Sequence, residues 1–157
     1  GFIDPPLLIP LPISKCYNRL VFSSSLKVFR MTRLFVVLAA AFAFVGVALG
    51  AFGAHGLAGV LAANGRADTF DTASQYHLIH ALALLGAAWA ADRWPGRLTR
   101  WAGWLFVTGM LLFSGSLYLL AIFNIGFMGA VAPLGGAVLL AGWACIGVAA
   151  WQDRGRN

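Results

Sequence analysis

Four long apolar runs alternate with short polar segments along the chain. They cover residues 34–53, 76–91, 101–123 and 130–151. A helix needs roughly 20 apolar residues to cross the hydrocarbon core of a bilayer, and these runs lie near that length. None of them alternates with the two-residue period of a barrel strand, and backbone groups in lipid must be bonded within their own segment. The pattern therefore predicts an all-α membrane protein, a bundle of four transmembrane helices.

The segment between the first two runs is predicted to have structure of its own. "GLAGVLAANG" (56–65) is typical of a short interfacial helix that ends at Asn64–Gly65. Asp68 then opens a helical lead-in to the second run. Between the last two runs, "NIGFMG" (124–129) is short and uncharged, so those two helices are predicted to be antiparallel neighbours.

Residues 1–30 differ from the rest of the chain. They hold four of the six prolines, whereas Met31 is followed by a basic residue and a long apolar run, as at a protein start. We therefore expect 1–30 to be an upstream extension outside the native fold, 31–152 to be the membrane domain and 153–157 a cytoplasmic tail. Two alternatives stay open. Residues 14–30 are rich in Lys, Arg and Ser and lack acids, as in a transit peptide, and 33–54 resemble a signal peptide.

Composition supports the membrane class. The chain is 61% hydrophobic and 10% charged, with a mean hydropathy of +0.83, whereas soluble domains are about 25% charged. The net charge of +6 would suit nucleic acid, but the basic residues lie in short segments beside apolar runs, where they act as topology signals. We therefore exclude nucleic acid as a partner.

The basic residues also predict the orientation. Only Arg66 lies between runs one and two, whereas the other ten precede run one, separate runs two and three, or follow run four. Those ten are Lys15, Arg19, Lys27, Arg30, Arg33, Arg93, Arg97, Arg100, Arg154 and Arg156. The positive-inside rule then places both termini of this multi-pass membrane protein in the cytoplasm.

Small residues predict how the helices meet, because close backbone contact drives helix association in lipid. Run one carries Gly46, Gly50 and Gly53 on one stripe, and run four carries Gly135, Gly136 and Gly142. We expect these glycines to pack helices together within one chain. A homodimer built on the run-one stripe is the alternative.

All three histidines lie beside apolar runs, and the predicted topology gathers them with other polar side chains in the outer leaflet. His77 and His80 are three residues apart and should share a helix face. The simplest interpretation is structural, since polar cross-links between membrane helices contribute about 0.6 kcal/mol each. The candidate cluster comprises His55, Gln75, Tyr76, His77, His80, Ser114, Ser116 and Tyr118.

Two other interpretations of this cluster stay open. One is a shallow site for a small polar ligand or a lipid headgroup. The other is a haem or metal site that uses His55 with His77 or His80. Ligating imidazoles usually recruit a carboxylate or a third histidine, and no acid lies within the apolar runs. We therefore predict no metal and no cofactor.

Four stretches resemble a known family: "GAFGAHGL", "TFDTASQYHLIHALALL", "LFSGSLYLL" and "APLGG". Together they are similar to the small membrane family catalogued as domain of unknown function 423, whose eukaryotic relatives are called transmembrane protein 256. The similarity covers about 31–151 in the same order. It implies a four-helix protein of the bacterial inner membrane, or of mitochondria in eukaryotes, without a settled activity, and it assigns no catalytic residue.

No enzyme signature appears in the sequence. It contains no His-Glu-x-x-His motif, no phosphate loop and no nucleophile elbow. The sequence therefore predicts a non-enzymatic accessory or assembly component of a membrane complex, with the lipid bilayer and other membrane subunits as partners. A ligand-binding or transport module and a haem or metal protein are the alternatives.

Overall fold

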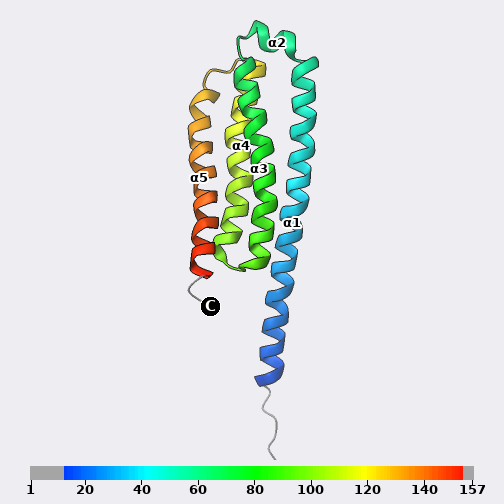
Figure 1. Cartoon of the computed structure of the whole chain (residues 1–157), viewed down its shortest axis with the longest axis vertical. Helices are drawn as coiled ribbons and strands as arrows, with labels where there is room; N and C mark the ends of the chain where they lie inside the picture. Colours follow the sequence, from blue (N-terminus) through cyan, green and yellow to red (C-terminus); the bar gives the residue numbers. More distant parts are fainter. Residues whose placement is uncertain (1–12, 154–157) are drawn as a thin grey trace, which may run out of the picture.

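The computed structural model describes the backbone of residues 13–153 and the side chains of residues 31–153. Its elements are helices: α1 (Ile13–His55), α2 (Ala58–Ala63), α3 (Ala67–Arg93), α4 (Arg97–Phe123) and α5 (Met128–Asp153). In Figure 1, α1, α3, α4 and α5 run side by side along the long axis, and α2 connects α1 to α3 across one end. Each predicted apolar run lies within one long helix.

The connection between α1 and α3 follows the sequence prediction. α2 ends at Asn64–Gly65, where Gly65 adopts a φ of +63°. The N–H of Gly65 donates to Ala62 O (3.1 Å), and the N–H of Arg66 donates to Leu61 O (2.9 Å). These two bonds satisfy carbonyls that the end of a helix leaves free. α3 then begins nine residues before the predicted run at Tyr76, which confirms the helical lead-in.

α1 is longer than the predicted first span. Its helix begins at Ile13 and continues past Met31 without a break. In Figure 1 its N-terminal part projects beyond the ends of the other helices. Residues 1–12 of the predicted upstream extension, and residues 154–157 of the predicted tail, lie outside the described residues. The division of the chain at residue 30 stays a prediction.

Three segments are long and apolar enough to cross a membrane: Met31–His55, Arg97–Phe123 and Met128–Asp153. α3, which contains the predicted second span, does not meet that criterion. It carries Gln75, His77 and His80 in its first half, and their polarity lowers its hydropathy. Most of the remaining side chains on its inner faces are alanine and leucine, and they are buried against neighbouring helices.

The helices pack in the order α1, α3, α4, α5, so α3 and α4 form the centre. The larger core cluster joins all four helices and includes Phe35, Leu84, Phe106, Met110 and Leu139. A smaller one, nearer α2, includes Leu61, Phe70, Tyr118 and Ala121. α1 packs mainly on α3, and α5 packs mainly on α4. The outer helices therefore keep large apolar faces exposed.

Glycines allow the helices to approach closely, as the sequence predicts. A Cβ atom at Gly46 would lie 2.7 Å from Leu78, and one at Gly53 would collide with the Phe70 ring. The α1 stripe therefore packs on α3 within the chain. On α5, Gly142 faces Phe106, and a Cβ at Gly135 would lie 2.7 Å from the Cα of Phe113. Cβ atoms at Gly50 and Gly136 would make only ordinary contacts, with nearest atoms at 3.4 and 3.7 Å.

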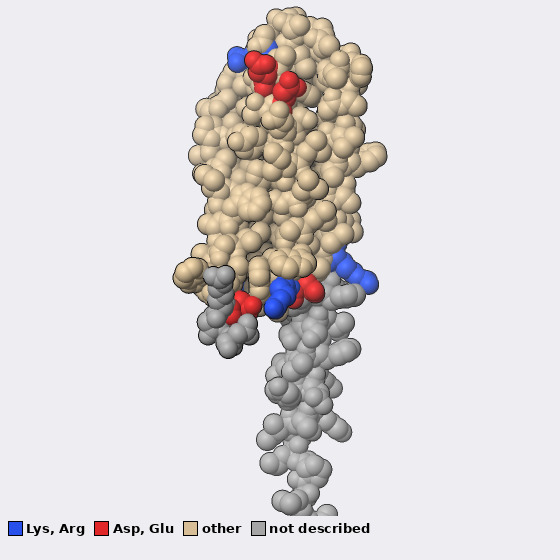
Figure 2. All heavy atoms as spheres, in the orientation of Figure 1, with Lys and Arg blue, Asp and Glu red and all other residues tan. Residues whose placement is uncertain are grey.

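Charged side chains lie only at the two ends of the described structure. Figure 2 shows blue and red atoms near each end and an uncharged band between them. Residues 34–65, 72–91 and 101–152 contain no Asp, Glu, Lys or Arg. On α3 the uncharged stretch is about 30 Å long at 1.5 Å per residue, which matches the hydrocarbon thickness of a bilayer.

We predict that Gly135→Ala destabilises the fold by about 1–3 kcal/mol, the usual cost of overpacking. The new methyl group meets backbone atoms of α4, which cannot rotate away, so α4 and α5 must separate. Gly147→Ala on the same helix is the matched control, because a Cβ there has no heavy atom within 4 Å. Unfolding by SDS in mixed micelles measures both. Equal stability of the two variants would contradict the close α4–α5 contact.

Candidate functional site

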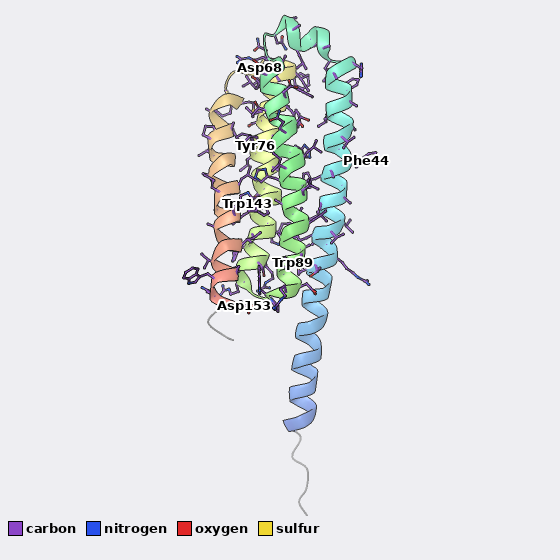
Figure 3. All side chains as sticks on the ribbon, viewed as in Figure 1. Phe44, Asp68, Tyr76, Trp89, Trp143 and Asp153 are labelled. Carbon is purple, nitrogen blue, oxygen red and sulfur yellow. The ribbon has the colours of Figure 1, made fainter. Side chains whose placement is uncertain are left out.

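His77 and His80 lie at the centre of the candidate site. Both are buried, with 6% and 5% of their surface exposed. His80 is nine residues from Asp71 and twelve from Asp92, or about 14 and 18 Å along α3. It therefore lies near the middle of the uncharged stretch, and His77 lies nearer the α2 end. Their place in the outer leaflet stays a prediction. Figure 3 shows Tyr76 and Trp143 between Asp68 near one end and Asp153 near the other.

The other predicted site residues do not all join these histidines. Tyr118 and Ser116 are buried on α4, whereas Gln75 is exposed on α3. His55 is exposed at the end of α1, nine residues or about 14 Å beyond Gly46, the glycine that contacts His77. The structure thus separates His55 from the two histidines of α3.

His80 has two hydrogen-bond partners, and their chemistry determines which of its ring nitrogens carries the hydrogen. Its Nδ1 lies 2.8 Å from the carbonyl oxygen of Tyr76, which can only accept, so Nδ1 donates. The indole N–H of Trp143 donates to Nε2 at 3.3 Å. The imidazole is therefore neutral and fully bonded, and it links α3 to α5. The Tyr76 ring stacks on it at 5.8 Å between centroids.

His77 faces other partners, although it is only one turn away. Its Nδ1 lies 3.4 Å from the hydroxyl of Tyr118, and Ser74 lies beside the same hydroxyl. A phenol is the stronger acid and an imidazole the stronger base, so Tyr118 donates to Nδ1 and the proton of His77 resides on Nε2. This Nε2 is buried and makes no hydrogen bond. The backbone of Phe42 is close to the ring, but no hydrogen bond to Nε2 has acceptable geometry.

His77 and Tyr118 border a groove of about 410 Å³ between α1, α3 and α4. Its remaining lining is apolar and consists of Leu38, Ala41, Phe42, Val45, Leu49, Met110, Leu111 and Gly115. Small-molecule sites typically have this size and an apolar lining with a few polar groups. We call this feature the lateral groove.

Neither serine of α4 forms a hydrogen bond with His77 or His80. Ser116 Oγ donates to the carbonyl of Phe113 at 2.9 Å, within its own helix. Ser114 is buried, and its hydroxyl has no partner among the described residues. Within residues 31–153, no group of three His, Cys, Asp or Glu side chains is placed to hold a metal ion. His77 and His80 turn to α4 and α5 respectively, so they do not share a ligand position.

Two contacts between distant parts of the chain were not predicted from the sequence. Trp143 is the partner of His80, and nothing in its local sequence within the fourth apolar run indicates that contact. Asn64 was predicted to end α2, but its side chain also donates to the carbonyls of Ala121 and Ile122, each at 3.0 Å. These bonds tie the α2 connection to the end of α4. No local pattern identifies such distant partners.

The family model described as "Protein of unknown function (DUF423)" matches residues 49–136. The chain belongs to this DUF423 family. UPF0382 membrane protein YwdK of Bacillus subtilis is 44% identical over 119 residues, which cover 75% of this chain and 96% of that protein. UPF0382 inner membrane protein YgdD of Escherichia coli is 41% identical, with 76% and 90% covered. No solved structure matches the chain.

The DUF423 match contains the central part of the site. His77, His80, Tyr118 and the close-packed Gly135 lie within residues 49–136, whereas Phe42 and Trp143 lie outside them. The family resemblance inferred from the sequence motifs is thereby confirmed. Its description supplies no activity, so the chemistry of the site must come from the geometry.

We predict that Trp143→Phe weakens the fold through loss of the bond to His80. A polar cross-link of this kind contributes about 0.6 kcal/mol in a membrane protein. Trp151→Phe on the same helix is the control, because that side chain is 75% exposed. The measurement is a double-mutant cycle of Trp143→Phe with His80→Leu, again by SDS unfolding. A coupling energy of zero would show that the two side chains do not interact.

Proposed function

We propose that the chain is an inner-membrane protein with four crossings and both termini in the cytoplasm. We further propose that it binds an uncharged, membrane-soluble molecule in the lateral groove. The observation that carries the binding function is the buried, unpaired Nε2 of His77 beside an apolar groove of ligand size.

The direction in which α3 runs supports four crossings. α1 and α4 each run from the end where α5 finishes to the end that carries α2. If both cross the bilayer, α3 must cross in the opposite direction, because it connects the α2 end to the turn at 94–96. Its polar side chains are tolerated because the neighbouring helices cover them.

The orientation is supported by the charges at the two ends. The α2 end carries Arg66 with two acids, Asp68 and Asp71. The opposite end carries four described arginines, Arg33, Arg93, Arg97 and Arg100, with Asp92 and Asp153. The excess of arginine favours the cytoplasmic side for the second end. The printed name of the Escherichia coli relative, an inner membrane protein, agrees with this location.

Cysteine labelling tests the orientation. With Cys16 and Cys145 replaced by alanine, we introduce Ala62→Cys on exposed α2 or Gly96→Cys in the exposed α3–α4 turn. A membrane-impermeant maleimide is expected to label residue 62 in spheroplasts, and residue 96 only after the membrane is permeabilised. The reverse pattern would invert the proposed topology.

The lateral groove suits a ligand that arrives through lipid. Its walls come from the membrane-crossing parts of α1, α3 and α4, and Val45 and Leu111 on them are 45% and 59% exposed. The Nε2 of His77 is covered from water, and a buried donor without a partner costs about 1–3 kcal/mol. When the side chains that cover Nε2 move aside, a ligand oxygen such as a carbonyl can accept from it and recover that cost, while the apolar body of the ligand fills the groove.

Gly115→Leu tests the groove without disturbing the helix packing. Gly115 lines the groove, and a Cβ there has no heavy atom within 4 Å, so leucine can occupy the space that the ligand needs. We expect unchanged SDS unfolding and at least a tenfold loss of a neutral molecule that co-purifies with the wild type, measured by mass spectrometry of solvent extracts. Gly147→Leu, also in open space, should retain the molecule.

Ligand binding in the lateral groove would be contradicted if Gly115→Leu retained the same molecules as the wild type. It would also be contradicted if no molecule were enriched with either protein. The accessory role in a larger membrane complex stays a prediction from the sequence, because every contact described above lies within one chain. The haem or metal role also stays untested, and the separation of His55 from His77 gives it no support.

A further inference from the structure

A second surface lies at the arginine-rich end of α4 and has a different chemistry. Arg97, Arg100, Trp101 and Trp104 follow the spacing 0, 3, 4, 7 and therefore share one face of the helix. With Met31 of α1 they line a cavity of about 260 Å³. We call these five residues the arginine–tryptophan site.

The two arginines of this site are available for an anion. Both are exposed, and neither forms an ion pair with any described residue. Arg93 differs, because its guanidinium lies 3.9 Å from Asp153. On the other side of Arg97 a larger cavity, of about 510 Å³, includes Asp153 in its lining. A carboxylate there repels anions, whereas the arginine–tryptophan site contains none.

The tryptophans limit which anion fits. Trp101 and Trp104 are 59% and 40% exposed, and neither indole N–H makes a hydrogen bond to a described residue. They follow the arginines toward the uncharged band, so the site passes from cationic to amphipathic to apolar along α4. Tryptophan prefers this boundary between water and hydrocarbon.

We infer that the arginine–tryptophan site binds an anionic phospholipid. Arginine holds phosphate oxygens with paired N–H donors, and the indole N–H groups can donate to the glycerol ester oxygens below the phosphate. The acyl chains then lie along the apolar part of α4. An anionic lipid is also the negative species that is abundant at a cytoplasmic membrane surface. This inference does not depend on a ligand in the lateral groove.

Native mass spectrometry of the full chain in mild detergent tests the site. The probes are phosphatidylglycerol and phosphatidylcholine with identical acyl chains, and inorganic phosphate serves as a competitor. We expect at least tenfold preference for phosphatidylglycerol in the wild type. In Arg97→Gln/Arg100→Gln the preference should fall to threefold or less, whereas Arg66→Gln at the opposite end should keep it.

Each other outcome contradicts the inference. Equal preference in the wild type and the double variant means that the two arginines do not bind the lipid. Displacement by inorganic phosphate at the lipid's own concentration means that the site takes a free anion instead. Should the double variant fail to fold, the single variants Arg97→Gln and Arg100→Gln decide, and an unchanged preference in both would overturn the site.

Discussion

The fold depends on the requirement that polar groups inside a membrane find partners within the protein. α3 must meet this requirement twice, because His77 and His80 both lie within its uncharged stretch, between Asp71 and Asp92. It can cross lipid only if its neighbours cover it. α1 and α4 do so from two sides, and Trp143 of α5 donates to His80. The most polar long helix is consequently also one of the most buried.

Local spacing predicted the long helices and four of the six glycine contacts, and only ordinary contacts are found at Gly50 and Gly136. The stripe through Gly46 and Gly53 indicated a packing face, and α3 provides the surface that fills it. The site was predicted less well. His77 and His80 share a helix face by spacing, but helices on different sides of α3 supply their partners. The second apolar run begins at Tyr76, whereas the uncharged stretch begins after Asp71, so the leaflet that holds His80 stays a prediction.

The two imidazoles illustrate how one helix can hold a structural and a binding group one turn apart. His80 has a partner on each ring nitrogen, so any new hydrogen bond must first break an existing one. His77 has a partner on Nδ1 only. A ligand that reaches Nε2 of His77 therefore gains a hydrogen bond without breaking another, whereas at His80 the exchange is at best neutral. This difference, rather than the number of histidines, favours His77 as the binding residue.

Residues of α1 and α4 line both proposed sites. α1 packs mainly on α3, so α4 keeps an uncovered flank from Trp101 to Tyr118. Phe35 interrupts this flank: it is fully buried, fits against Gly103 and meets the Trp104 ring at 5.8 Å between centroids. The lateral groove lies on one side of Phe35 and the arginine–tryptophan site on the other. The two sites share no lining residue, so a headgroup held by the arginines and a ligand beside His77 occupy different positions along α4.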